Sequence, residues 1–319
     1  MATIRIATFN AENLFARYKF NSNVDPAAAV RDGWNADARH FDISDEPSKT
    51  ITARAIKELK ADVIALQEIE NLDTLKRFRS GFLGGFKAYP HAVAIDGNDP
   101  RLIDVAVLSR LPLVNIRTHQ HLRDGPTALF SRDCLELDVV VSPSKTVTLY
   151  VNHLKSMLDK KDACHGRAKT RAKRLKQAQA VKQIVIDRFG QQAGRQPFII
   201  LGDLNDYLAT DVQGTTGIDD LAGWDQVVNV VDRLPEADRW THFFKGRSSR
   251  ACKLPAGYHQ LDYLLVSKSL AAATARVPEI ERRGMPTRAD RFTGARFPGV
   301  GKNEPKASDH CPVVMQLTV

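Results

Sequence analysis

The chain has 319 residues, of which 43% are hydrophobic and 26% are charged, as is usual for a globular protein. This composition excludes a disordered or collagen-like chain, and no apolar run approaches the roughly 20 residues that cross a bilayer. The net charge of +9 favours encounters with polyanions such as nucleic acid or anionic lipid headgroups. A basic solvated surface explains the charge equally well, so charge alone selects no partner.

In chain order, short apolar runs rich in β-branched residues predict eight strands. They lie at residues 4–9, 63–66, 105–108, 135–141, 147–151, 198–201, 261–266 and 313–317. Two segments, residues 50–60 and 167–189, place apolar side chains on one stripe and predict helices. Long loops are expected at residues 16–47, 208–223 and 282–306, the last because it is rich in glycine and proline.

The arrangement of these elements favours an α/β (α+β) layered sandwich over a regular alternation of strands and helices, because many strands separate the two helices. No linker rich in serine, glycine or proline lies in mid-chain, and no segment repeats at a fixed period. We therefore predict a single domain over residues 1–319.

Four cysteines, Cys134, Cys164, Cys252 and Cys311, show neither a CxxC pair nor a zinc spacing. They are expected to be reduced and to serve packing. The N-terminus lacks a charged segment followed by an apolar signal core, so we expect a cytoplasmic protein. Export without a signal peptide, or after loss of a leader, stays open. No feature indicates a protein partner.

Polar side chains stand at the ends of several predicted strands. They are, in chain order, Asn10, Gln67-Glu68, Asn152-His153, Asp203 with Asn205, and Asp309-His310. Sheets carry polar residues at their ends in any case, so each place alone has an ordinary structural interpretation. Five such places together indicate a shared functional site.

These residue types suit one kind of chemistry. Asparagine, glutamate and aspartate oxygens are the ligands of a hard cation such as Mg²⁺ or Mn²⁺. His153 and His310 add proton transfer or hydrogen bonds near neutral pH. Such a site is equipped to hydrolyse a phosphate ester, because the cation neutralises developing charge while a carboxylate aligns and deprotonates a water.

Six short motifs between residues 8 and 313 carry a resemblance to a known family. They are Thr8-Phe9-Asn10-Ala11-Glu12, Gln67-Glu68, Asn152-His153-Leu154-Lys155-Ser156, Gly202-Asp203-Leu204-Asn205-Asp206, Gln260-Leu261-Asp262-Tyr263 and Ser308-Asp309-His310-Cys311-Pro312-Val313. In type and order they resemble the motifs of the endonuclease/exonuclease/phosphatase superfamily, which includes pancreatic deoxyribonuclease. The resemblance implies a four-layer α-β-β-α sandwich of two packed mixed sheets, with the site at one edge of the sheets.

The resemblance also implies roles for individual residues. Asn10 and Glu68 match the family's magnesium ligands, and Asp309 completes or supports that metal site. Asp203 matches the residue that orients or deprotonates the attacking water. Asn205 matches the residue that holds a phosphate oxygen.

The histidines and their partners follow from the same resemblance. His310 matches the histidine that contacts the scissile phosphate, and Asp262 the carboxylate that orients it. The Asn-His-Leu-Lys-Ser form around His153 resembles the deoxyribonuclease, sphingomyelinase and secreted-nuclease branches. By analogy Asp104 is its acidic partner, although a strand cap is the alternative. Arg110 fits a family position near the substrate groove, and a solvated strand-end arginine is its alternative.

The segment from His153 to Lys176 is strongly basic, with nine lysines and arginines against two aspartates. On a helix its arginines share one stripe and its lysines the next, which predicts a basic face that lines a phosphate track. These residues are Arg167, Arg171 and Arg174, and Lys169, Lys173 and Lys176. Lys155, just before them, is a candidate substrate contact. A solvated surface helix is the alternative.

Together these observations predict a Mg²⁺- or Mn²⁺-dependent phosphodiesterase, foremost a nuclease acting on DNA or RNA. The alternative enzyme is a phosphatase or phosphodiesterase for a small-molecule, lipid or inositol phosphate. A catalytically silent binding protein is disfavoured, because the residues that match the family's ligands are all present. The sequence leaves open the substrate, endo- or exo-cleavage, the number of metal ions and the oligomeric state.

Overall fold

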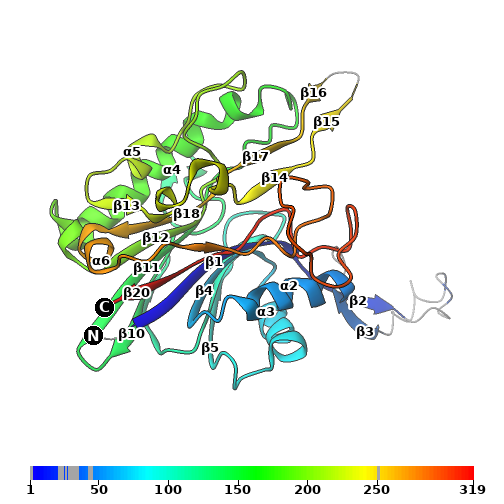
Figure 1. Cartoon of the computed structure of the whole chain (residues 1–319), viewed down its shortest axis with the longest axis horizontal. Coiled ribbons are helices and arrows are strands. Elements are labelled where there is room, and N and C mark those ends of the chain that lie inside the picture. Colours follow the sequence, from blue (N-terminus) through cyan, green and yellow to red (C-terminus); the bar gives the residue numbers. More distant parts are fainter. Residues whose placement is uncertain (1–2, 21–24, 26, 28–35, 42–45, 250–251) are drawn as a thin grey trace.

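Two six-stranded mixed sheets form the framework of the computed structural model, which describes residues 3–20, 25, 27, 36–41, 46–249 and 252–319 (Figure 1). The first sheet contains, in spatial order, β19 (Glu279–Ile280), β20 (Val313–Thr318), β1 (Thr3–Leu14), β4 (Val63–Ile69), β6 (Asp104–Ser109) and β5 (His91–Ile95). The second contains β13 (Val227–Asn229), β18 (Asp262–Ser267), β12 (Phe198–Asp203), β11 (Lys145–His153), β10 (Leu135–Ser142) and β7 (Leu113–Arg117). All eight predicted strands are present.

The remaining elements are two-stranded pairs and helices. The two-stranded pairs are β2 (Ala16–Phe20) with β3 (Ala36–Phe41), β8 (Arg123–Asp124) with β9 (Thr127–Ala128), β14 (His242–Phe244) with β17 (Gly257–His259), and β15 (Arg247–Ser248) with β16 (Lys253–Leu254). The α-helices are α2 (Glu46–Glu58), α3 (Leu72–Phe78), α4 (Gly166–Phe189), α5 (Asp219–Ala222) and α6 (Lys268–Ala273). Short helical turns are η1 (Arg79–Leu83), η2 (Ala193–Arg195), η3 (Val230–Arg233) and η4 (Glu236–Asp238).

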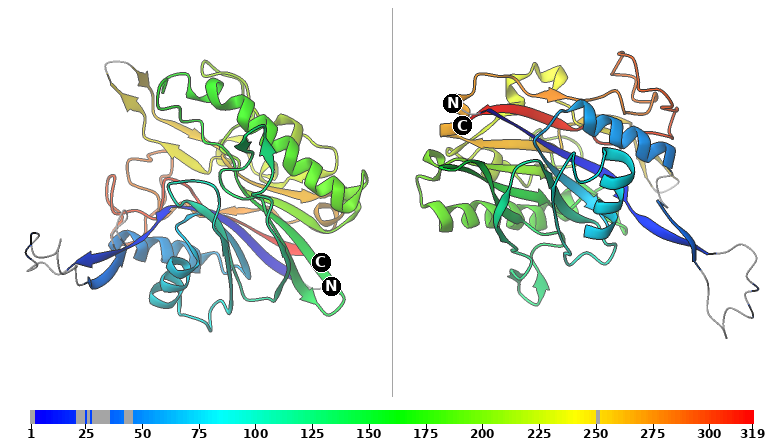
Figure 2. Two further views of the ribbon diagram at one scale, coloured as in Figure 1. Left: turned by 180° about the vertical axis from the view of Figure 1, so that it is seen from behind. Right: turned by 90° about the horizontal axis from the view of Figure 1, so that it is seen from below.

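The alternation of side chains along each strand builds four layers. On β1, Ile4 and Ile6 pack between the two sheets, whereas Ala7 and Phe9 face the opposite way, toward α2 and α3. On the second sheet, Phe198 and its neighbours face α4 and α5. Figure 2 shows the two helical layers on the outer faces of the paired sheets. The predicted α-β-β-α sandwich is therefore confirmed.

Both predicted helices are present, and two of the three predicted loops need little change. Residues 282–306 contain no helix or strand, and residues 208–223 contain only the four-residue helix α5. The expectation of a loop over 16–47 is wrong at its two ends, because Ala16–Phe20 pairs antiparallel with Ala36–Phe41 and α2 begins at Glu46. The rest of that stretch lies outside the described residues, apart from positions 25 and 27. Among the described helices, none has the length and apolarity to span a membrane.

Candidate active site

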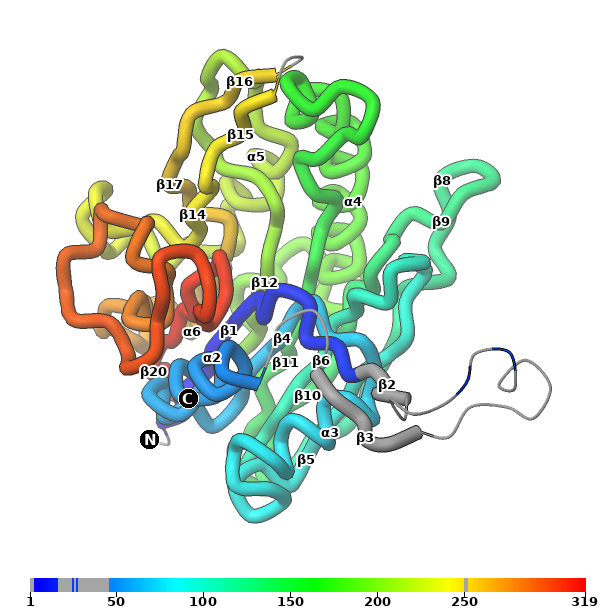
Figure 3. The backbone as a smooth tube through the Cα atoms, turned by 90° about the vertical axis from the view of Figure 1, so that its right-hand side faces the viewer, coloured from blue at the N-terminus to red at the C-terminus, as the bar shows by residue number. Residues whose placement is uncertain are grey.

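The polar strand ends meet at one edge of the paired sheets. β1 and β4 run parallel, with Asn10 opposite Gln67, and β11 and β12 run parallel, with His153 opposite Asp203. β18 is antiparallel to β12, so it begins at the same edge, with Asp262 opposite Asp203. β20 is antiparallel to β1, and the loop before it returns to this edge. Figure 3 looks onto the loops that gather there.

Asp203 stands at the centre of this group and is fully buried. Its Oδ2 accepts hydrogen bonds from Nδ2 of Asn10 at 3.0 Å and Nδ2 of Asn205 at 2.9 Å. The same oxygen lies 3.5 Å from Nε2 of His153 and 3.9 Å from Nε2 of His310. Burial raises the pKa of Asp203 well above its usual range, and the charge of His310 opposes this. The structure thus brings four predicted site residues around one carboxylate oxygen of a fifth, Asp203.

The residue before Asp203 must be glycine for β12 to approach β11 this closely. Gly202 has φ +131°, and a Cβ atom there would lie 2.0 Å from the carbonyl oxygen of Asn152. A side chain at this position would force β12 away from β11 and displace Asp203 from His153. The glycine of the Gly202-Asp203 motif therefore has a local structural cause.

A β-bulge places Glu68 in the site. The pairing of β1 with β4 shifts between Asn10 and Leu14, and Glu68 adopts φ +63°, which is unusual for a residue other than glycine. Its Oε1 accepts from Nδ2 of Asn10 at 3.4 Å, and its Oε2 accepts from the amide of Asn13 at 3.0 Å. Glu12, Asn13 and Asn205 also have positive φ and also line the site, so backbone strain is concentrated there.

His310 and Asp262 form the expected pair. Nδ1 of His310 lies 2.8 Å from Oδ2 of Asp262, and both side chains are buried. Burial disfavours the imidazolium, but the charges of Asp262 and Asp203 outweigh it and raise the pKa of His310 well above its usual range. With Nδ1 bonded to a carboxylate, Nε2 is left facing the site.

The expected pairing of His153 with Asp104 is not formed. Nδ1 of His153 is buried and has no hydrogen-bond partner among the described residues. Asp104, at the start of β6, instead accepts from the amide of Gly97 at 2.9 Å and is not among the residues that line the pocket. Burial, and then the charge of Arg132, lower the pKa of His153, so the ring is neutral. Among the described residues, no contact of Asp104 supports a catalytic role.

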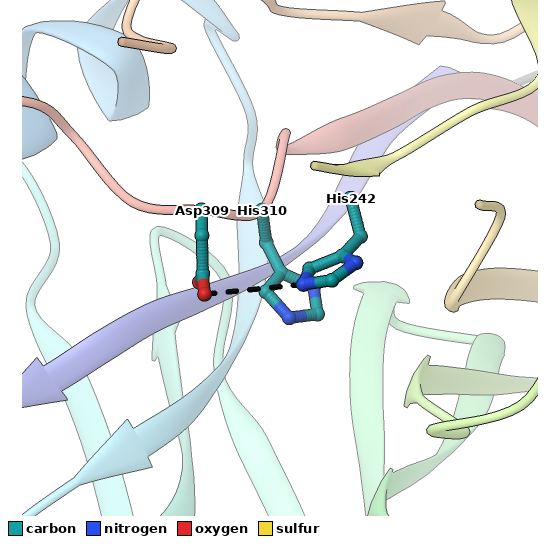
Figure 4. A group of neighbouring side chains, drawn as sticks. All are labelled: His242, Asp309 and His310. Atoms are coloured by element: carbon teal, nitrogen blue, oxygen red, sulfur yellow. Dashed lines mark ion pairs between the residues drawn. The ribbon is translucent and has the colours of Figure 1, made fainter. Parts of the chain in front are cut away.

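Asp309 faces the site from the loop before β20. Its side chain is 38% exposed, and Oδ2 lies 3.9 Å from Nε2 of His242. His242 comes from β14, and sequence reasoning missed it because a lone histidine among aromatic residues carries no spacing signal. Figure 4 shows that its ring lies against that of His310, with centroids 4.6 Å apart.

A pocket of about 380 Å³ is bordered by Glu68, His153, Asp203, Asn205, His242, Asp309 and His310. Asn10 and Asp262 are buried behind this wall and do not line the pocket. Two arginines that sequence reasoning missed stand in its wall. The buried Arg132 lies 3.2 Å from Asp99, and the half-exposed Arg101 lies 2.8 Å from the same side chain. Both guanidinium groups put positive charge beside the carboxylates of the pocket, where an anionic substrate is expected. Single arginines before a strand gave no motif to recognise.

The predicted position of Arg110 near the substrate groove is wrong. β6 is antiparallel to β4, so Ser109 pairs with Val63 and the amide of Arg110 donates to the carbonyl of Asp62. This places Arg110 at the start of β4, roughly 17 Å along the strand from Glu68. The sequence alone did not reveal the direction of β6.

Lys155 lies beside the pocket without lining it. Its Nζ donates to the carbonyls of Ser156 and Leu158, at 2.9 and 3.0 Å. Burial, helped by Arg132 and Arg174, lowers the pKa of Lys155 to about 8. The ammonium group therefore organises the following loop, and a direct contact with substrate stays a prediction.

The predicted basic face of α4 is wrong for two of its arginines. Arg167 and Arg174 are fully buried and donate from Nε to the two oxygens of Asp206, at 2.8 and 2.9 Å. In the first turns of the helix Ala168 and Ala172, which were expected on the apolar stripe, are exposed. Ala178, Val181 and Val185 of the same expected stripe are buried. These arginines do not line a phosphate track. They anchor the residue next to Asn205 and so hold the loop of the site.

The expectation of four reduced cysteines is also wrong. Cys164 and Cys252 form a disulfide across 88 residues, whereas Cys134 and Cys311 are buried free thiols. Cys164 lies in the segment before α4, which borders the pocket with Met157, and Cys252 lies beside β16, which borders it with Leu254. The disulfide therefore ties together two segments of the pocket rim. In Figure 3 the β15–β16 hairpin lies beside this segment.

Comparison with known proteins assigns the family. The model of the endonuclease/exonuclease/phosphatase family matches residues 8–310. The chain belongs to this family. Members of the endonuclease/exonuclease/phosphatase family use divalent metal ions, and the chain is accordingly a metal-dependent phosphoric ester hydrolase. No match was found among curated proteins.

Solved structures of family members share the fold at low identity. Truncated TDP2 of Caenorhabditis elegans has 15% identity and a TM-score of 0.58, with 99% of this chain and 98% of that chain covered. The catalytic domain of human Nocturnin, with a bound sulfate anion, has 15% identity and a TM-score of 0.60, covering 99% and 94%. TDP2 of D. rerio, complexed with a single-strand DNA product, has 16% identity and a TM-score of 0.59, covering 100% of both chains.

The donor set fits the divalent cation that the family uses. Glu68 and Asp309 face each other closely enough that the charge of Asp309, after burial, raises the pKa of Glu68. Two carboxylates held together in a buried pocket favour a cation between them. Oδ1 of Asn10 accepts one hydrogen bond, from the amide of Glu12, and retains a second lone pair. Asn10, Glu68 and Asp309 are therefore suited to hold the ion.

Proposed function

We propose that the chain is a divalent-metal-dependent phosphodiesterase that hydrolyses DNA or RNA. The observation that carries this proposal is the position of Asp203, whose Oδ2 lies 3.5 Å from Nε2 of His153 and 3.9 Å from Nε2 of His310. Two imidazoles around one buried carboxylate suit a phosphate group that is attacked by water on one side and releases its leaving oxygen on the other.

Asp203 is the group that orients and deprotonates the attacking water. Its buried position raises its pKa, which makes it a stronger base than an ordinary carboxylate. The amide of Asn205 donates to Oδ1 of Asp203 at 2.8 Å and fixes the plane of the carboxylate. Nδ2 of Asn205 donates to Asp203 and, at 3.2 Å, to the carbonyl of Leu154, and it exchanges one of these bonds for a phosphate oxygen when the substrate enters.

The two histidines have different protonation states and therefore different roles. Nδ1 of His310 is bonded to Asp262, which stabilises the protonated ring, and Nε2 donates its proton to the scissile phosphate or leaving oxygen. His153 is neutral because burial and Arg132 disfavour its charge, so it acts as a hydrogen-bonding partner of phosphate and of Asp203. Asn10, Glu68 and Asp309 hold Mg²⁺ or Mn²⁺, which when bound neutralises charge on the phosphate.

Nucleic acid is the substrate class that we propose. Arg101, Arg132 and Arg247 line the pocket, and the whole chain carries a net charge of +9. Among the structural neighbours, TDP2 of D. rerio was solved with a single-strand DNA product. Repeated phosphates along a strand match a basic pocket better than an isolated phosphate does.

A panel of substrates tests this proposal. With Mg²⁺ or Mn²⁺, the protein should cleave single-stranded DNA, plasmid or RNA, and exhaustive chelation should abolish cleavage until metal is restored. The apparent affinity for nucleic acid should fall steeply with salt, because several phosphate contacts release counterions. Hydrolysis confined to sphingomyelin, inositol phosphates or bis-p-nitrophenyl phosphate would overturn the choice of nucleic acid and favour the phosphatase alternative.

Two further points belong to this proposal. Residues 1–319 act as one catalytic domain, since the family match and both sheets extend through nearly the whole chain.

The protein works in an oxidising compartment, not in the cytoplasm that its N-terminus suggested, because a disulfide such as Cys164–Cys252 is rare in reducing surroundings.

A further inference from the structure

His242 is held beside Asp309 by the backbone. It forms a β-bridge with His310, and the amide of Phe243 donates to the carbonyl of Asp309 at 3.0 Å. The pairing of β14 with β17 places His242 opposite His259 and continues this support. The position of the imidazole relative to the Asp309 side chain is therefore set by main-chain hydrogen bonds on both sides.

The two side chains present a nitrogen and an oxygen toward one another at a spacing that suits a metal ion. Nε2 of His242 lies 3.9 Å from Oδ2 of Asp309, too far for a hydrogen bond (Figure 4). Two ligand atoms that each lie about 2.1 Å from one ion are at most about 4.2 Å apart. The gap is therefore wide enough for a cation that both atoms contact.

Apart from its ring contact with His310, the His242 side chain makes no contact among the described residues that explains its place in the pocket wall. Its side chain is only 13% exposed, and its Nδ1 is buried without a hydrogen-bond partner among the described residues. The unpaired Nδ1 shows that, within the described part of the chain, no side-chain hydrogen bond from this nitrogen fixes the ring, and Nε2 remains on the side of Asp309.

His310 does not compete for this role, although it lies within reach of the same atoms. Its Nδ1 is bonded to Asp262, and its Nε2 faces Asp203 at 3.9 Å. That leaves Nε2 of His242 as the nitrogen donor next to Asp309. Oε2 of Glu12 accepts a hydrogen bond from the amide of Asp309, and this bond keeps the Asp309 loop in place.

We propose that His242 is a nitrogen ligand of the active-site metal centre, sharing the ion with Asp309. The inference rests on the proposed function, because it adds a ligand to the set formed by Asn10, Glu68 and Asp309. Imidazole binds Mn²⁺, Co²⁺ and Zn²⁺ more readily than Mg²⁺, which prefers oxygen ligands. The nitrogen therefore shifts the site's selectivity away from Mg²⁺ and toward these transition metals.

Electron spin-echo envelope modulation of the Mn²⁺-loaded protein tests the ligand directly, because a directly bound imidazole couples its ¹⁴N nucleus to the Mn²⁺ electron spin. The wild type should show this coupling, and His242→Phe, which keeps a ring against His310, should lose it. Calorimetric titration should show that the variant binds Mn²⁺ about tenfold or more weakly, with a much smaller change for Mg²⁺. His121→Phe, which changes an exposed histidine outside the pocket, is the matched control.

The outcomes separate the two proposals. If Mn²⁺ binds tightly but the ¹⁴N coupling is the same in wild type and His242→Phe, the ligand role of His242 is overturned while the proposed function stands. If neither Mn²⁺ nor Mg²⁺ binds the wild-type protein, both fail. Circular dichroism melting and a second variant, His242→Gln, show whether a loss of coupling reflects the missing nitrogen or an unfolded β14. Loss of coupling in both folded variants supports the ligand role.

Discussion

Nδ1 of His310 lies 2.8 Å from Oδ2 of Asp262, and the pair is buried at the edge where β12 and β18 meet. Burial alone would keep the imidazole neutral. The negative charges of Asp262 and Asp203 reverse this and raise the pKa of His310. Because Asp262 raises the pKa of His310, the interaction between the two residues can be measured as a pKa shift in the metal-free protein.

Asp262→Asn should lower the pKa of His310 toward its ordinary value of about 6.5. A raised folded-state pKa stabilises the fold below the unfolded pKa, and this stabilisation is lost as pH rises through the folded pKa. The stability difference between wild type and variant should therefore shrink with rising pH. NMR titration of His310 and urea unfolding at several pH values check both points. Glu136→Gln, beside His119, is the control; an unshifted His310 in Asp262→Asn contradicts the pairing.

Asp203→Asn should reduce the turnover of nucleic acid about 10²- to 10⁴-fold, because the amide no longer accepts a proton from water. Binding of substrate should persist, since the arginines of the pocket are unchanged. Steady-state kinetics and a filter-binding assay measure the two effects. Asp187→Asn, on the exposed face of α4, should keep full activity. A wild-type rate for Asp203→Asn rules out its role as the base.

Asp206→Asn should destabilise the protein by about 3–5 kcal/mol, because it leaves Arg167 and Arg174 buried without their carboxylate. Urea unfolding measures this loss. The matched change Asp220→Asn removes the partner of Lys182 in an exposed pair and should cost less than about 1 kcal/mol. Equal losses of stability in the two variants would show that the buried ion pairs of Asp206 stabilise the protein no more than the Lys182–Asp220 pair does.

The double change of Cys164 and Cys252 to serine should lower stability by about 2–5 kcal/mol, because the cross-link closes a long loop in the unfolded chain. The disulfide itself is checked by thiol titration in denaturant. The wild type should show two reactive thiols, from Cys134 and Cys311, and four after reduction. Four thiols before reduction would contradict the disulfide.

Much of the fold could be predicted from the sequence, because an element buried on one face carries apolar residues at regular intervals. The strand at 4–9 and the helix at 50–60 show apolar residues at the period of their structure, and both are present. The motif residues Asn10, Glu68, Asp203 and His310 were found because each follows or precedes such an element.

The features that could not be predicted from the sequence depend on contacts between segments that lie far apart in the chain. The helix at residues 167–189 was predicted correctly, and Ala178, Val181 and Val185 are buried as expected. Its first turns are oriented differently, because Asp206 draws Arg167 and Arg174 into the interior. Arg110 was misplaced because the direction of β6 is a property of the sheet. His242 and Arg132 carry no spacing signal, since only tertiary structure brings them to the pocket.

The link between Cys164 and Cys252 has a practical consequence for anyone who produces this protein. A recombinant host with reducing cytosol would deliver folded sheets whose two rim segments are unconnected. Preparations from such a host and from a periplasmic or secretory host would then differ in how firmly the two segments of the pocket rim are held together, even at identical purity.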